Sequence, residues 1–210
     1  MYVGRIVAVG RNRKGQLAAL YRVSSRSFPN REAQIKENAV VIVPKKGAEG
    51  DVFKSPYIAY NCLRIAGRTA VATNGSQTDP IAEKVAAGMP PRDAFALSLL
   101  ALDYEKDSYN TPRIAAAVTA GGDAGYLGVV REDGLDVCRL KLEPGECFFV
   151  STYETNHVSR AQRGEFDAAD AREGAEFILR GGVFAEMTNA VTGVCAIEKD
   201  GRFEIAVAQA

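Results

Sequence analysis

Histidine and paired cysteines are the chemically active residues that this sequence most clearly lacks. Its 210 residues include one histidine, His157, and four cysteines, Cys62, Cys138, Cys147 and Cys195, which are far apart and form no CxxC pair. A zinc site needs closely spaced cysteine and histidine ligands. We therefore expect no metal and interpret the cysteines as small buried residues of the core.

An excess of charge of one sign and a long apolar run are also missing. The 26 basic side chains equal the 26 acidic ones, so no global positive field attracts the chain to nucleic acid or to an anionic membrane. No segment approaches the roughly 20 apolar residues that a membrane-spanning helix needs, and no signal-peptide pattern opens the chain. The sequence predicts a cytoplasmic protein with no nucleic-acid or membrane partner.

Glycine-rich phosphate loops are absent as well. The pairs Gly121-Gly122 and Gly181-Gly182 belong to neither a GxGxxG nor a GxxxxGK[ST] pattern. The sequence therefore predicts neither a dinucleotide-binding turn nor a P-loop, and we expect no use of a nucleoside triphosphate.

The apolar pattern predicts many short strands and three helices. Strands are expected at 2–10, 16–23, 39–43, 57–65, 69–73, 114–119, 126–131, 135–142, 147–152, 193–198 and 203–208. Helices are expected at 79–87, 91–103 and about 168–179. Because hairpin-connected strands dominate and strict strand-helix alternation is absent, we expect one α+β domain, residues 1–210, with largely antiparallel sheets.

Although the chain is neutral, its first third is basic. Residues 1–70 carry 13 basic and 4 acidic side chains, and the remainder carries 13 and 22. Within this third, the serine-, proline- and asparagine-containing segment 21–31 bears Arg22, Arg26 and Arg31. Guanidinium groups match phosphate oxygens and stay charged at every working pH, so we expect these three to converge on a phosphate. A solvated basic loop without a ligand is the structural alternative.

Two further segments offer polar groups next to expected strands. Tyr60 and Asn61 lie in the expected strand 57–65, where alternation puts them on opposite faces. A strand bend there would present a phenol and an amide to a cleft, although tyrosine on a strand is more often a core or rim residue. Asn74-Gly75 is a strong turn signal, and this turn either faces a ligand or only leads into the following helix.

The segment 103–113 joins an apolar helix to a strand so apolar that it should be buried. It carries acidic, phenolic, amide, hydroxyl and cationic side chains on a short tether: Tyr104, Glu105, Tyr109, Asn110, Thr111 and Arg113. This mixture suits polar recognition and proton transfer in a cleft. Its composition is equally that of a solvated loop.

Five strings, taken in order, resemble the archaeal-type IMP cyclohydrolases. They are MYVGRIVAVGRN (1–12), YRVSSRSFPNR (21–31), YIAYN (57–61), ATNG (72–75) and YNTPR (109–113). The resemblance runs nearly from end to end. It implies an enzyme of purine biosynthesis that closes the ring of 5-formamidoimidazole-4-carboxamide ribotide to give IMP and water, with a small purine ribotide as the substrate and no cofactor.

The resemblance also implies an architecture, a four-layer α-β-β-α sandwich like that of the N-terminal-nucleophile hydrolases. Those hydrolases need a serine, threonine or cysteine at the mature terminus, whereas this chain begins Met1-Tyr2-Val3. Hydrolysis by that route is therefore not expected. A homo-oligomer is expected, of a size that the sequence leaves open.

Ring closure within one molecule depends first on positioning, because the carboxamide nitrogen must be held against the formyl carbon. With the resemblance, we assign Arg31, Tyr60 and Glu105 to catalysis. Substrate binding is assigned to Arg22, Arg26, Asn61, Asn74, Tyr109, Asn110 and Arg113. Tyr60, or a guanidinium group near it, would stabilise the anionic formyl oxygen, and Glu105 would relay a proton from the amide nitrogen to the departing hydroxyl.

Two other functions use the same residues. An amide hydrolase of the same architecture is motivated by the hydroxyl-rich segment 24–27. A non-catalytic purine-ribotide-binding protein would use the same arginines. The single histidine, His157, is interpreted as a structural loop residue rather than a catalytic one.

Overall fold

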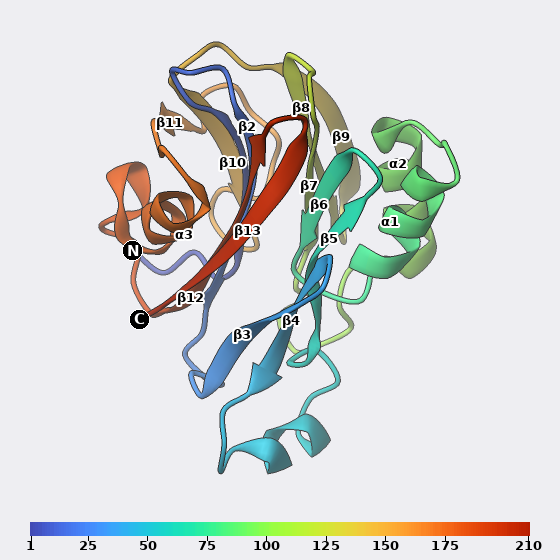
Figure 1. The fold of residues 1–210 in the computed structure, drawn as a ribbon. Coiled ribbons are helices and arrows are strands. Elements are labelled where there is room, and N and C mark those ends of the chain that lie inside the picture. Colours follow the sequence, from blue (N-terminus) through green and yellow to red (C-terminus); the bar gives the residue numbers. More distant parts are fainter.

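Two antiparallel β-sheets lie face to face, and helices cover their outer surfaces (Figure 1). The computed structural model describes all residues from 1 to 210. Sheet A contains β1 (Ile6–Arg11), β2 (Leu17–Ser24), β10 (Glu146–Ser151), β11 (Arg163–Glu165), β12 (Ala190–Lys199) and β13 (Arg202–Gln209). Sheet B contains β3 (Arg31–Lys36), β4 (Ala39–Pro44), β5 (Tyr60–Ala66), β6 (Thr69–Thr73), β7 (Arg113–Thr119), β8 (Ala124–Arg131) and β9 (Gly134–Lys141).

The three α-helices begin and end close to where the sequence predicts them. They are α1 (Thr78–Ala86), α2 (Pro91–Leu102) and α3 (Ala171–Arg180), and 3₁₀ turns cover Glu49–Phe53 (η1) and Gly182–Phe184 (η2). Proline at the first position of α2 has no amide hydrogen to leave unpaired. The Asp170 side chain caps α3 by accepting a hydrogen bond from the Glu173 amide. None of these helices is long and apolar enough to cross a membrane.

The sheets are simple in connectivity. Sheet A has the strand order β11-β10-β1-β2-β12-β13, and sheet B has the order β3-β4-β5-β6-β7-β8-β9. Every paired strand in both sheets is antiparallel. This confirms the predicted α+β class with antiparallel sheets.

Three apolar clusters join the layers. The largest, with 26 buried residues, fills the space between the two sheets. A cluster of 17 residues joins the outer face of sheet A to α3, and one of 8 residues joins sheet B to α1 and α2. Figure 1 shows α3 on one side of the molecule and α1 and α2 on the other. Both sheets are thus covered on both faces.

Alternation along β2 sends successive side chains into different layers. Tyr21 shares the inter-sheet face with Ala19 and Val23. Arg22 points to the opposite face, toward η2 and the segment that follows it. Because sheet A is covered on both sides, both Tyr21 and Arg22 are buried.

The clearest departure from the sequence prediction is β3, which the apolar pattern misses. Its residues Arg31–Lys36 are mostly polar, and only Ala33 joins the inter-sheet core. The strand exists because it pairs along its length with the apolar strand β4. Arg31 therefore stands at the start of an edge strand and not within a loop.

Candidate active site

Polar side chains gather at one end of the inter-sheet layer, where several strands of both sheets begin or end. Arg5 precedes β1, Tyr60 opens β5, and Arg113 opens β7. Asn74 follows β6, and Glu105 lies in the segment between α2 and β7. Antiparallel pairing brings the end of β6 beside the start of β7, which explains how residues distant in sequence meet here.

Glu105 is the central carboxylate of this cluster and is only 1% exposed. Its two oxygens accept hydrogen bonds from Arg5, at 3.1 Å from Nη1 and 2.8 Å from Nη2. Arg113 Nη1 lies 4.0 Å from the same carboxylate. Burying a carboxylate is costly unless it is paired and hydrogen-bonded, and these two guanidinium groups offset that cost.

The electrostatics of Arg5 follow from this pairing. Burial is the largest single influence and lowers the pKa of Arg5, but the Glu105 carboxylate together with Tyr60 and Tyr21 outweighs it, and the net effect raises the pKa above its ordinary value. For Arg113, burial is the larger influence and lowers the pKa, while Glu105 opposes it. Both side chains stay cationic at neutral pH.

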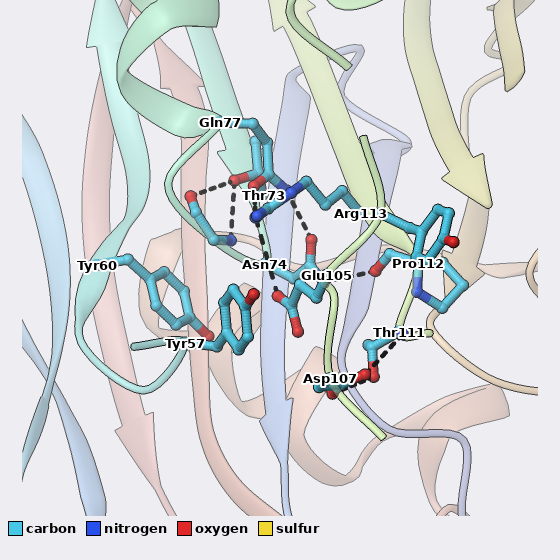
Figure 2. A network of polar contacts seen from close by, with 12 residues as sticks. Tyr57, Tyr60, Thr73, Asn74, Gln77, Glu105, Asp107, Thr111, Pro112 and Arg113 are labelled. Carbon is cyan, nitrogen blue, oxygen red and sulfur yellow. Dashed lines mark hydrogen bonds and ion pairs between the residues drawn. The ribbon is translucent and has the colours of Figure 1, made fainter. Parts of the chain in front are cut away.

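A chain of amide and guanidinium groups fixes the next layer of the cluster, and Figure 2 shows it beside Glu105. Arg113 Nη1 donates to Gln77 Oε1 at 3.0 Å, and Gln77 Nε2 donates to Asn74 Oδ1 at 2.7 Å. Asn74 Nδ2 in turn donates to the Pro112 carbonyl at 2.9 Å. A side chain at Gly75 would collide with this chain, because a Cβ there would lie 2.9 Å from Arg113 Nη1.

Three tyrosines complete the cluster. The Tyr60 hydroxyl lies 2.5 Å from the Tyr21 hydroxyl, which reaches it from sheet A. Tyr57 places its ring 5.8 Å from the Arg113 guanidinium carbon. Figure 2 shows Tyr57 and Tyr60 on one side of Glu105. The structure thus brings Tyr60, Asn74, Glu105 and Arg113, all predicted site residues, into one cluster.

The predicted convergence of the three early arginines is wrong. Arg22 is fully buried on the far face of sheet A, where Nη1 donates to the Phe184 carbonyl at 3.0 Å. Its other donors go to Ser24 Oγ and to the carbonyls of Met187 and Thr188. Strand alternation separates Arg22 from the site, so its position fits a structural role.

The other two arginines of that segment also lie apart. Arg26 is exposed, and its guanidinium carbon lies 4.0 Å above the centre of the Tyr2 ring. Arg31 is 4% exposed on the same face of sheet B as Tyr60, and Nε donates to the Phe28 carbonyl at 3.0 Å. No carboxylate pairs with Arg31, which leaves a buried positive charge suited to an anionic ligand.

Asn61 points away from the cluster, which corrects its predicted place in the cleft. Its amide donates to Asp79 Oδ1 at 2.9 Å, and Arg64 donates to the same oxygen at 3.0 Å. Both lie on the outer face of sheet B, beside α1. A β-bulge explains why Asn61 and Arg64 share a face: the register with β4 skips one residue, so Cys62 and Leu63 both reach the inter-sheet core.

The segment 103–113 divides between the cluster and the surface. Its backbone is held by the Glu105 amide, which donates to the Thr111 carbonyl at 2.8 Å. Tyr109, in contrast, is 73% exposed. Asn110 is exposed and donates to Glu132 at 2.8 Å. Neither side chain reaches the cluster, contrary to the sequence prediction.

A polar cavity of about 400 Å³ lies on the other side of this segment. Its lining includes Tyr109, Asn110, Arg131, Tyr153 and His157. The His157 side chain is 61% exposed there, and its Nδ1 lies 3.5 Å from an oxygen of Asp136.

Sequence reasoning missed four members of the cluster: Arg5, Tyr21, Tyr57 and Gln77. Arg5 and Tyr21 fall within the strings that carry the family resemblance, and this was the only signal available for them. Nothing in the local sequence distinguishes Arg5 from other basic residues next to strands. Its importance arises from contact with Glu105, which is 100 positions away along the chain.

The arrangement defines a class of protein. A buried carboxylate held by two arginines, a phenol and fixed amides form a preorganised polar site of the kind that enzymes use to position a substrate and to stabilise developing charge. The site contains no group of three metal-ligating side chains, and neither does the rest of the chain.

Comparison with known proteins gives the particular family. Residues 2–202 match the model of the IMP cyclohydrolase-like protein family. A protein of Methanosphaera stadtmanae named IMP cyclohydrolase is 49% identical over 200 residues, which cover 95% of this chain and 96% of the relative. Proteins of the same name from Methanocella arvoryzae and Methanocaldococcus jannaschii are 47% identical over 208 residues and 41% identical over 203 residues. The first alignment covers 99% of this chain and 98% of the relative, and the second covers 96% of each.

The chain therefore belongs to the IMP cyclohydrolase-like family, as its sequence strings predict. Membership makes it an enzyme, a cyclohydrolase of IMP biosynthesis.

Proposed function

We propose that this enzyme closes 5-formamidoimidazole-4-carboxamide ribotide to IMP in the last step of purine biosynthesis. The observation that carries the proposal is the family match over residues 2–202, joined to a buried cluster of Tyr60, Glu105 and Arg113 that suits such a reaction. The carboxamide nitrogen attacks the formyl carbon, and a carbon-nitrogen bond forms. The formyl oxygen then leaves as water, with one hydrogen from the carboxamide nitrogen and one from the formamide nitrogen.

Positioning supplies much of the rate in this proposal. Both reacting groups belong to one molecule, and well-oriented intramolecular reactions reach effective molarities of about 10⁵ M or more. Arg31 holds the phosphate, because it is buried and has no carboxylate partner. The rigid chain of Asn74, Gln77 and Arg113 gives the heterocycle a fixed wall to lie against.

Stabilisation of the developing charge and proton transfer supply the rest of the rate enhancement. Negative charge develops on the formyl oxygen as the tetrahedral centre forms, and the Tyr60 hydroxyl donates a hydrogen bond to it. Glu105 accepts a proton from the attacking nitrogen and returns it to the departing hydroxyl. Arg5 holds both carboxylate oxygens, so Glu105 keeps one orientation throughout.

The proposal keeps only part of the site predicted from sequence. Arg22 and Asn61 are left out, because their donors are engaged on faces that the cluster does not share. Arg26, Tyr109 and Asn110 are exposed and would contribute only at the rim.

We make further proposals on domain organisation, cellular location, assembly and cofactor use. We propose that residues 1–210 act as one cyclohydrolase domain, in the cytoplasm, as a homo-oligomer and without a cofactor. The helix-sheet-sheet-helix layering supports a likeness to the N-terminal-nucleophile hydrolases in architecture alone.

A spectroscopic ring-closure assay tests the function. Purified protein is mixed with the formamido ribotide without added metal or nucleotide, and the assay is repeated after chelation. We expect IMP to form far faster than in buffer, with the same rate after chelation. A protein that binds the ribotide without accelerating IMP formation would be a binding module, and release of formate instead of IMP would indicate an amide hydrolase.

A further inference from the structure

The Tyr21 hydroxyl is a buried polar group with a single partner. Tyr21 is 0% exposed, and its side chain lies within the apolar layer between the sheets. Its hydroxyl makes one hydrogen bond, to the Tyr60 hydroxyl at 2.5 Å. Because Tyr21 belongs to sheet A and Tyr60 to sheet B, this contact crosses the whole inter-sheet layer.

The rings hold these hydroxyls in place. The Tyr21 and Tyr60 rings meet edge to face, with centroids 6.5 Å apart and an interplanar angle of 72°. This geometry is favourable for two aromatic rings, and it fixes both phenols without the hydrogen bond. Loss of one hydroxyl would therefore leave the packing in place.

Burial decides which hydroxyl donates. Each phenol has one hydrogen and can also accept. A buried donor without a partner costs more than a buried acceptor with a spare lone pair, so the enclosed Tyr21 hydroxyl gives its hydrogen to its one partner. Tyr60 is 8% exposed and is therefore the more accessible phenol of the pair. Its own hydrogen is then free to point toward the cluster.

We propose that Tyr21 is a positioning residue, which donates to the Tyr60 oxygen and so directs the Tyr60 hydrogen toward the formyl oxygen of the substrate. This inference rests on the proposed ring closure. Donation into Tyr60 also polarises its O–H bond, because hydrogen bonds in a chain strengthen one another. Tyr21 acts only through Tyr60 and touches no substrate.

The charges around the pair favour the same arrangement. Burial, followed by the proximity of Tyr60, raises the pKa of Tyr21 well above its ordinary value, while Arg5 opposes that rise. Tyr21 thus keeps its hydrogen at working pH, as a donor must.

A mutant cycle tests the inference through activity. We expect Tyr21→Phe to lower kcat about tenfold, the size of one hydrogen bond, and to leave KM within about twofold. In a Tyr60→Phe background, Tyr21→Phe should change kcat no further. The matched control is Tyr126→Phe on β8, outside the cluster, which should leave kcat unchanged. Equal kcat for Tyr21→Phe and wild type, or equal losses in both backgrounds, would overturn the inference.

A neutron crystal structure of the ligand-free protein tests it without activity. The deuterium of Tyr21 should lie on the line between the two hydroxyl oxygens, and that of Tyr60 should point away from Tyr21. The reverse assignment would overturn the inference even in an active enzyme. A wild-type protein that fails to form IMP would instead refute the proposed function and would leave the neutron result to decide the hydrogen-bond direction.

Discussion

Two arginines, Arg5 just before β1 and Arg22 in β2, show how the same side chain is used in opposite ways on opposite faces of sheet A. The Arg5 side chain, directly before β1, is 11% exposed and donates to the Glu105 carboxylate with both terminal nitrogens. Arg22 is 0% exposed on β2 and donates to backbone carbonyls beside η2. One face of the sheet holds the polar cluster, and the other holds α3.

The pKa values of the two arginines shift in opposite directions for this reason. For Arg5 the Glu105 carboxylate, together with Tyr60 and Tyr21, outweighs burial and raises the pKa. For Arg22 burial lowers the pKa to about 10, because no carboxylate stands beside it. The face of the sheet on which an arginine lies therefore decides its role. On the inter-sheet face its charge takes part in the site, and on the α3 face it hydrogen-bonds the backbone beside η2.

Of all substitutions in the polar cluster that contains Arg5, replacement of Glu105 should lower turnover the most. We expect Glu105→Gln to lower kcat by about 10² to 10⁴, the range for loss of a general acid or base, with a smaller change in KM. The matched control is Glu132→Gln, because Glu132 is an exposed carboxylate outside the cluster. Steady-state rates of IMP formation measure both variants, and a kcat within twofold of wild type would remove Glu105 from catalysis.

Replacing Arg22 should affect folding instead. Arg22→Met leaves the buried carbonyls beside η2 without their donor, so the free energy of unfolding should fall by about 3 kcal/mol. Denaturant unfolding measures this loss, and the exposed Arg26→Met should change stability by less than about 0.5 kcal/mol. The KM of the folded Arg22→Met protein should match wild type, and a large rise would mean that Arg22 binds substrate after all.

Arg31 should behave like the arginines of the site and not like Arg22. We expect Arg31→Ala to raise KM about 10- to 100-fold, because a charge-assisted contact to phosphate is lost, and to lower kcat less. The control is Arg64→Ala, on the outer face of sheet B, where the arginine pairs with Asp79. Unchanged ribotide binding by Arg31→Ala would place the phosphate elsewhere.

The smallest expected effect is a pH dependence of stability that comes from Tyr21. Its folded pKa lies well above the ordinary value of 10.0, so below pH 10 Tyr21 is protonated in both states and its contribution is complete. Above that pH the unfolded chain loses the proton first, and stability falls by up to about 1.4 kcal/mol per pH unit. Between pH 9 and 11, the free energy of unfolding should fall more steeply with pH for wild type than for Tyr21→Phe. Equal slopes would contradict the raised pKa of Tyr21.

Local pattern predicted most of the fold for a physical reason. Apolar alternation and turn residues report directly on strands that pack against a core, and helix-start signals located the three helices within a few residues. β3 escaped because Arg31, Glu32 and Lys36 interrupt its apolar pattern, and its partner β4 supplies the pairing. A strand stabilised by its neighbour has no signature of its own.

The site was harder to predict, because its geometry depends on which layer each residue faces. Alternation separates Tyr21 from Arg22, but both are buried, so sequence polarity cannot tell which face carries the cluster. Asn61 was misplaced because a strand bend was expected to turn it toward the cleft, whereas regular alternation after Tyr60 keeps it on the outer face beside Asp79. Arg5 gains its role only from Glu105, through a contact that no local pattern encodes.

A crystal structure with bound IMP is the most direct test of the central claim, that the inter-sheet cluster is the place of ring closure. We predict the purine between Tyr60 and Glu105 and the phosphate against Arg31. A nucleotide seated instead in the cavity beside Arg131 and His157, or on the Arg22 face of sheet A, would contradict it.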